Sequence, residues 1–206
     1  MKITPIEFRN NLKLTLRGFV HEPKRYETAV LYLHGFPGSM MSGAMRMCKA
    51  LSHNGYLSMR FEFSGTNTSE GKFENKLMSQ EIKDVKYAID FLEKNYSFKK
   101  LILIGHSTGA IDAALYSYKD SRITKVILSG AVSKLDEAAR YDFTDIQIRD
   151  FWKKGYIMYT NPERWYHKQK LKKAFYDEFF TLNIPKAISK LHKPILIIHA
   201  QCDKAI

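Results

Sequence analysis

Short apolar runs alternate with longer amphipathic segments along this chain, and that alternation limits the folds that it can adopt. Nearly continuous apolar runs are typical of strands buried on both faces, as in a parallel sheet covered by helices. After an opening hairpin formed by 3–9 and 12–21, we expect such strands at 29–33, 57–63, 101–104, 126–128 and 194–199. Helical patterns separate these runs at 43–53, 82–92 and 110–118. The sequence therefore predicts an α/β fold with a mostly parallel sheet.

The 206 residues are enough for one domain, and 45% hydrophobic residues with 13% aromatic ones exclude a disordered chain. The strand pattern stops between about 131 and 192, where the composition becomes aromatic and basic. We therefore expect a first part of the core at 1–132, a small helical cap at 133–192, and a return to the core at 193–206. No stretch has the roughly 18 apolar residues of a membrane span or a signal-peptide core, so we expect a cytoplasmic protein without a membrane span.

The net charge of +12 is compatible with a nucleic-acid partner, an anionic surface or a well-solvated exterior. No helix-turn-helix, zinc-knuckle or RNP-like pattern accompanies the charge, so we expect no nucleic-acid partner. Cys48 and Cys202 do not have the spacing of a metal or disulfide motif. We therefore expect two reduced cysteines, no metal and no cofactor, while the oligomeric state stays open.

A nucleophile elbow is the strongest chemical signal in the sequence. Gly105, Ser107 and Gly109 form the pattern Gly-x-Ser-x-Gly between an apolar strand and a helix. A sharp turn of this kind lifts the serine hydroxyl out of the sheet, and the small flanking residues let the backbone pass. An ordinary glycine turn is the alternative interpretation. We expect Ser107 to be a nucleophile, with His106 as part of the turn.

Two backbone N–H groups are candidates for an oxyanion hole. Thr108 begins the helix after the elbow, where the N–H groups and the helix dipole favour negative charge. The loop after the strand at 29–33 offers the N–H of Phe36, because His34 and Gly35 allow a sharp turn there. The alternative is a plain glycine–proline loop. We expect Phe36 and Thr108 to be the two donors.

With these motifs, the chain resembles the α/β-hydrolase superfamily, and within it the branch of cinnamoyl (feruloyl) esterases and serine aminopeptidases (S33). The resemblance covers about 28–132 and resumes at 193, and the matching segments are 34–36, 60–65, 69–73, 105–109 and 199–203. The chain departs from the pattern at 64–67, where Ser-Gly-Thr-Asn replaces a loop with a basic or histidine residue. Thr108 replaces a common Gln, and Ala200 replaces a Gly.

The resemblance implies that Asp203 is the acid of a Ser-Asp-His triad, with the histidine after one further strand. A loop-capping aspartate is the alternative for Asp203. No histidine of the chain has the expected position, although His167 in the cap is a possible internal base; the seven are His21, His34, His53, His106, His167, His192 and His199. We therefore expect the chain to be the front part of a longer hydrolase, without its last strand and helix and nearly inactive by itself.

The resemblance implies a serine hydrolase that cleaves small-molecule carboxylic esters through an acyl-enzyme, in the manner of cinnamoyl esterases. An aminopeptidase or thioesterase using the same site is one alternative, since a fold does not fix the substrate. A non-catalytic binding protein that has lost the base is another.

The cap leaves two further questions open. Its aromatic residues suit either a roof over an apolar acyl pocket or a small core. Between 149 and 173, eight basic residues accompany two acidic ones, which fits either steering of anionic substrates or a solvated surface.

Overall fold

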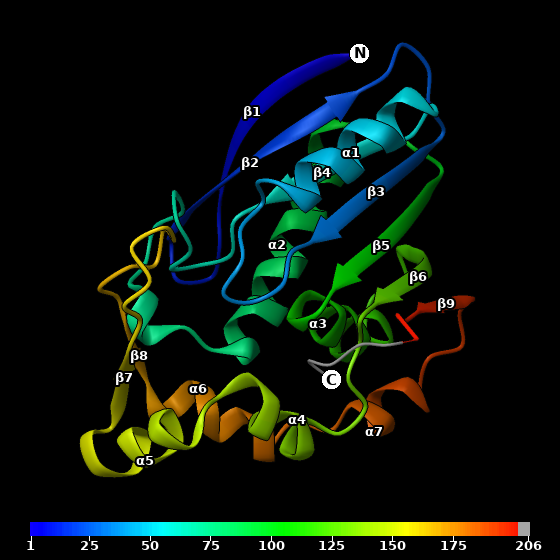
Figure 1. Cartoon of the computed structure of the whole chain (residues 1–206). Helices are drawn as coiled ribbons and strands as arrows, with labels where there is room; N and C mark the ends of the chain where they lie inside the picture. The colour runs from blue at the N-terminus through cyan, green and yellow to red at the C-terminus, as the bar shows by residue number, and fades with distance from the viewer. Residues whose placement is uncertain (202–206) are drawn as a thin grey trace.

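The computed structural model describes residues 1–201, which contain one seven-stranded sheet with the order β1-β2-β4-β3-β5-β6-β9 (Figure 1). β1 and β2 form the predicted antiparallel hairpin, β2 is also antiparallel to β4, and the remaining neighbours are parallel. The strands are β1 (Lys2–Arg9), β2 (Thr15–Glu22), β3 (Thr28–Leu33), β4 (Leu57–Phe61), β5 (Lys100–His106), β6 (Ile123–Ser129) and β9 (Ile195–Ile198). The predicted mostly parallel sheet is confirmed.

Helices cover both faces of the sheet, which explains the unbroken apolar runs of its central strands. In β3, Leu31 and Leu33 belong to the core under α2 (Met78–Asn95) and α3 (Thr108–Ser117). Val30 and Tyr32, on the other face, pack with Cys48 of α1 (Gly43–His53). Successive residues of a strand point to opposite faces, so a strand between two helical layers needs apolar side chains at every position.

The segment after β6 forms the cap, which Figure 1 shows beyond the ends of β3 and β5 that lead into the site. It consists of α4 (Leu135–Asp142), α5 (Asp145–Lys154), β7 (Tyr156–Met158), β8 (Lys170–Lys172), α6 (Lys173–Asp177), η2 (Glu178–Phe180) and α7 (Ile184–Ile188). The helical cap was predicted, but the antiparallel ribbon β7–β8 was not. This ribbon packs on η1 (Phe73–Asn75) of the core. Within residues 1–201, no helix is both long and apolar enough to cross a membrane.

The crossing of β5 and α3 leaves no room for side chains at two glycines of the elbow. A Cβ on Gly105 would lie 2.1 Å from the carbonyl oxygen of Gly109, and one on Gly109 would lie 2.5 Å from that of Leu33. Backbone atoms cannot rotate away as a flexible side chain can. The two glycines therefore let α3 begin directly against β3 and β5, which fixes the position of Ser107 between them.

A layer of buried charged side chains supports α3 from α2. Lys76 Nζ lies 2.5 Å from Glu81 Oε1, and both side chains are almost fully buried. Asp112 of α3 is completely buried, and no hydrogen bond within residues 1–201 reaches either of its carboxyl oxygens. Burial, together with the negative charge of Glu81, raises the pKa of Asp112 well above its ordinary value. The folded chain therefore favours the protonated, neutral form of this carboxyl.

Gly105→Ala is expected to lower the free energy of unfolding by about 2–3 kcal/mol, because the added methyl group overlaps the backbone of α3. Urea denaturation of the purified protein measures the change. Gly43→Ala is the matched control, since a Cβ at Gly43 meets nothing within 4 Å. A Gly105→Ala variant with the wild-type urea midpoint would contradict the proposed close crossing.

Asp112→Asn is expected to stabilise the protein more at pH 8 than at pH 5. Because the folded-state pKa of Asp112 is raised, the unfolded chain releases a proton that the folded chain retains, and stability falls as the pH rises above about 4. Asparagine does not titrate, so the variant escapes this loss. We expect its Tm at pH 8 to rise by a few degrees, since about 1 kcal/mol moves Tm by roughly 2–4 °C in a chain of this size.

Scanning calorimetry at both pH values measures this difference. Asp136→Asn, on the exposed surface of α4, is the control and should change Tm by less than about one degree at either pH. Equal effects of Asp112→Asn at pH 5 and pH 8 would contradict a raised pKa.

Candidate active site

Ser107 occupies a strained turn between β5 and α3. Its backbone has φ 54° and ψ −126°, a conformation that non-glycine residues rarely adopt. Its N–H donates to the carbonyl of Ser129 at 2.9 Å, and its own carbonyl accepts from the N–H of Ala110 at 2.8 Å. Neighbouring strand and helix thus hold the strained residue from both sides. This is the geometry that the Gly-x-Ser-x-Gly pattern predicts.

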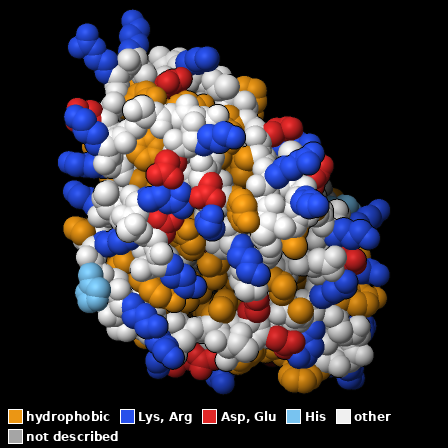
Figure 2. Space-filling model, turned by 180° about the vertical axis from the view of Figure 1, so that it is seen from behind, with side chains coloured by type: hydrophobic (Ala, Val, Ile, Leu, Met, Phe, Trp, Pro, Cys, Tyr) orange, Lys and Arg blue, Asp and Glu red, His pale blue; other side chains and the backbone are white. Residues whose placement is uncertain are grey.

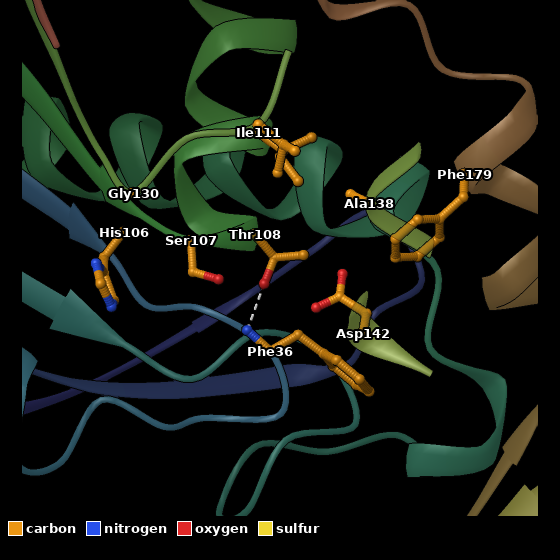
Figure 3. Close-up of a pocket in the computed structure, with 10 residues that line it drawn as sticks. Phe36, His106, Ser107, Thr108, Ile111, Gly130, Ala138, Asp142 and Phe179 are labelled. Carbon is orange, nitrogen blue, oxygen red and sulfur yellow. Dashed lines mark hydrogen bonds between the residues drawn. The ribbon is translucent and has the colours of Figure 1, made fainter. Parts of the chain in front are cut away.

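The loop after β3 brings a backbone N–H beside the elbow. Phe36 N–H donates to the hydroxyl of Thr108 (Figure 3). Gly35 lies so close to the elbow that a Cβ on it would be 2.8 Å from Ser107 Cβ. A second hydrogen bond, from Gly38 N–H to the Gly35 carbonyl at 2.9 Å, closes the turn of the loop. In this structure, the Thr108 hydroxyl is therefore the acceptor for the Phe36 N–H, which is one of the two predicted oxyanion donors.

His34 and Glu62 fasten this loop from behind. Both side chains are buried, and His34 Nε2 lies 3.3 Å from Glu62 Oε2. Glu62 also accepts hydrogen bonds from Met40 N–H at 3.0 Å and from Asn67 Nδ2 at 3.2 Å. The carboxylate therefore joins the loop of residues 34–40, called the oxyanion loop below after the predicted role of Phe36, to the loop after β4. These contacts give His34 and Glu62 a positioning role.

Two cavities meet at Ser107. The smaller has a volume of about 170 Å³, and its walls are Phe36, His106, Ser107, Thr108, Ile111, Gly130, Val132, Ala138, Asp142 and Phe179. The larger, of about 460 Å³, lies between the oxyanion loop, the start of α1 and residues 164–166 of the cap. Both cavities include Phe36, His106 and Ser107. A substrate with its reacting carbon at Ser107 can therefore extend in two directions.

Asp142 is the one Asp or Glu among the described residues that line the smaller cavity. Figure 3 shows this carboxyl, at the end of α4, directed into the cavity toward Thr108. Solvent reaches the side chain, yet the protein around it raises the pKa of Asp142 to about 6 by desolvation. The phenol of Tyr159 is close enough for the charge of Asp142 to contribute to the raised pKa of Tyr159, of which burial is the main cause. The cavity thus combines apolar walls with a carboxyl group and with the polar side chains of the elbow.

Aromatic side chains dock the cap onto the oxyanion loop. The ring of Phe36 lies 4.4 Å from that of Phe175 and 5.8 Å from that of Phe73, measured between centroids. Trp165 Nε1 donates to the carbonyl of Pro37 at 3.1 Å. Phe175 is fully buried, whereas Phe179 lines the smaller cavity. The aromatic residues of the cap therefore serve both as a small core and as a pocket wall.

The structure brings together most of the residues that the sequence singles out, namely His34, Gly35, Phe36, Gly105, His106, Ser107, Thr108 and Gly109. Asp203 lies outside the described residues 1–201. Within that range, no hydrogen bond joins the Ser107 hydroxyl to an imidazole, and His167 lines neither cavity at the nucleophile. No group of three possible metal ligands occurs in the described part of the chain either.

Sequence reasoning missed Asp142, because the carboxyl belongs to no motif. Its position at the end of an amphipathic helix is typical of a solvated residue. Only the docking of α4 over the elbow turns this carboxyl toward Ser107.

Solved structures similar to this one include α/β-hydrolases and esterases. The Est1E structure from Butyrivibrio proteoclasticus with bound ferulic acid has a TM-score of 0.81 and 20% identity, over 98% of this chain and 80% of that one. The α/β-hydrolase GrgF from Penicillium sp. sh18 gives 0.79 and 15%, over 100% and 82%. The Pyrococcus furiosus esterase Pf2001 gives 0.71 and 20%, over 95% and 69%. At these identities, the similarity establishes the fold.

A comparison with curated protein sequences finds no match. The sequence profile described as serine aminopeptidase, S33, matches residues 24–178, which is most of the chain. The matched range contains the oxyanion loop, the elbow and most of the cap. Sequence and fold agree, and this chain belongs to the serine aminopeptidase S33 family of α/β-hydrolases.

Proposed function

We propose that this protein is a serine hydrolase that cleaves carboxylic esters through an acyl-enzyme. The observation that carries the proposal is the position of Ser107, which lies on a strained elbow where two cavities meet and beside the Phe36 N–H. Strained serines at such turns present their hydroxyl to a substrate carbonyl. The esterases among the similar structures support the same chemistry.

The reaction follows from this arrangement in two halves. Ser107 Oγ bonds to the ester carbonyl carbon while an imidazole takes the hydroxyl proton, and the resulting oxyanion accepts hydrogen bonds from the N–H groups of Phe36 and Thr108. The carbon–oxygen bond to the alcohol then breaks, and the imidazole returns the proton to the leaving oxygen. A water molecule then attacks the carbonyl carbon of the acyl-enzyme while the imidazole takes its proton. The bond to Ser107 Oγ breaks, the imidazole returns the proton to Ser107, and the acid is released. Asp203 remains our proposal for the acid that orients the imidazole.

The Thr108 hydroxyl has a separate part in this cycle. Before a substrate binds, it accepts the hydrogen bond of the Phe36 N–H, so this half-buried donor is not left unpaired. The developing oxyanion then replaces the hydroxyl oxygen as the acceptor. Because a negative oxygen is the stronger acceptor, the exchange favours the tetrahedral intermediate over the free enzyme.

The smaller cavity supports an aromatic acid as the acyl group. Phe36, Ile111 and Phe179 give it apolar walls, and Asp142 supplies one hydrogen-bond acceptor. A ring that carries a hydroxyl group fits this combination, because the ring contacts the walls and the hydroxyl donates to the carboxyl. Est1E, whose structure holds ferulic acid, is a structural relative. We therefore propose esters of hydroxylated aromatic acids as substrates.

An aminopeptidase is the second candidate, because the carboxyl of Asp142 could also pair with the ammonium group of an aminoacyl substrate. The family profile carries that description. Turnover of aminoacyl 4-nitroanilides, compared with that of 4-nitrophenyl esters of the same acids, separates the two activities. We expect ester turnover alone.

Ser107→Ala is expected to lower kcat for 4-nitrophenyl esters by a factor of about a thousand or more in the full-length protein, because no covalent intermediate can form. Release of 4-nitrophenol measures the rate. Ser189→Ala, at an exposed serine after α7, is the control and should keep wild-type activity. Turnover within tenfold of wild type by Ser107→Ala would remove this residue from the mechanism.

Asp142→Ala is expected to reduce the preference for methyl 4-hydroxycinnamate over methyl cinnamate by about tenfold in kcat/KM, the effect of one hydrogen bond to a charged group. The pKa of Asp142 is about 6, so the stronger, ionised acceptor forms as the pH rises from 5 to 7. The wild-type preference should therefore grow over that range.

Asp145→Ala, at the exposed start of α5, is the control for the loss of one carboxyl group. Its preference and its pH dependence should match those of the wild type. An unchanged preference in Asp142→Ala would show that the acyl group does not contact this carboxyl.

A further inference from the structure

The larger cavity opens on the side of Ser107 away from Asp142. Its walls come from the oxyanion loop, from the start of α1 with the exposed Met41, and from Arg164, Trp165 and Tyr166 of the cap. The smaller cavity is instead enclosed by α3 and by α4 and η2 of the cap. The smaller cavity therefore suits the acyl group, which stays on Ser107 during the reaction. The larger cavity, with its exposed rim, suits the alcohol, which has to leave the site.

The two cavities have opposite charges. Among the described residues that line the larger cavity, Arg164 is the only Lys or Arg, and there is no Asp or Glu. Among those that line the smaller cavity, Asp142 is the only acid, and there is no Lys or Arg. The two halves of a substrate therefore meet different electrostatic environments on either side of the reacting carbonyl.

Several other basic side chains of the cap have partners of their own. Lys154 lies 3.0 Å from Asp150, Lys172 lies 3.6 Å from Glu74, and Lys173 pairs with Asp177. Lys170 lies over the ring of Tyr156. On the back of the molecule, basic side chains are scattered among acidic and apolar ones (Figure 2). Much of the net charge of +12 therefore comes from solvated surface side chains that have no part in the two cavities.

Arg164 differs from these residues in two respects. No ion pair within residues 1–201 involves its guanidinium, and it is the basic residue of the cap that lines a cavity containing Ser107. Its backbone is held in a turn, since its N–H donates to Asn161 at 3.3 Å and its carbonyl accepts from His167 at 3.0 Å. The next residue, Trp165, is tied to the Pro37 carbonyl of the oxyanion loop. An unpaired cation is thus carried by an anchored segment beside the nucleophile.

We infer that the larger cavity binds the leaving-group half of the ester and that Arg164 binds a carboxylate on that half. A planar guanidinium matches a carboxylate through two parallel hydrogen bonds, and one cation balances one monoanion. Trp165, which also lines this cavity, adds an apolar surface for the body of the leaving group. The assignment of this half as the leaving group rests on the proposed function. The released product is then a hydroxy acid.

A binding experiment tests the carboxylate site without requiring catalysis. The chain has two tryptophans, Trp152 and Trp165. In a ¹⁵N NMR spectrum of the Trp152→Phe variant, the one remaining indole N–H signal is that of Trp165, and it reports binding in the larger cavity. Titrations with 4-hydroxybenzoate and with its neutral analogue 4-hydroxybenzamide give two Kd values. We expect the carboxylate to bind at least tenfold more tightly, as a charge-assisted hydrogen bond implies.

Arg164→Gln should bring the two Kd values within about twofold of each other. Arg149→Gln is the matched control, because it removes one exposed guanidinium from α5, outside both cavities, and should keep the preference. The inference is overturned by equal Kd values in the wild type, by undetectable binding of 4-hydroxybenzoate, or by a preference that survives in Arg164→Gln.

Hydrolysis of 4-acetoxybenzoate and 4-acetoxybenzamide by the full-length protein tests the assignment to the leaving group. We expect kcat/KM to be about tenfold higher for the carboxylate, with the difference lost in Arg164→Gln. If both esters are cleaved equally, the proposed function stands and this inference fails. If neither is cleaved but the binding preference holds, the anion site stands and its assignment to the leaving group fails, while turnover of 4-nitrophenyl esters tests the esterase proposal separately.

Discussion

The strained backbone of Ser107 is the constraint on which the rest of the site depends. A φ of 54° is costly for serine, and it persists because β5, β6 and α3 hold the residue through the hydrogen bonds to Ser129 and Ala110. Gly105 and Gly109 allow the strand and the helix to meet closely enough to enforce this turn. The same crossing brings the loop of Phe36 against the elbow, so the same close contacts position both the Ser107 hydroxyl and the Phe36 N–H.

The cap completes the site through contacts with that same loop. Rings of the cap and of η1 surround Phe36, and the indole of Trp165 is bonded to Pro37. Because the cap packs on the loop of Phe36, α4 lies over one side of the elbow and residues 164–166 lie over the other. Two cavities of different charge result, one with Asp142 and one with Arg164. The core thus fixes the position of Ser107, while the cap contributes the charged groups of the two cavities.

The central fold and the elbow could be predicted because both depend on local patterns. Apolar runs mark strands that helices cover on both sides, and the glycines around Ser107 mark a turn that only small residues permit. Asp142 and the ribbon β7–β8 could not be predicted, since each depends on how distant segments pack. The buried carboxyl of Asp112 is a similar case, because its sequence position alone does not reveal that Lys76 and Glu81 lie beside it. The triad acid expected at Asp203 stays a prediction.

Mass spectrometry of the protein after reaction with a fluorophosphonate tests the central claim most directly. An activated serine attacks the phosphorus atom, fluoride leaves, and a stable phosphonate ester remains on the nucleophile. The account predicts, for the full-length protein, one covalent adduct on the peptide that contains residues 105–109, with the added mass on Ser107. An adduct on a different serine, or a fully unlabelled elbow peptide, would contradict the assignment of Ser107 as the nucleophile.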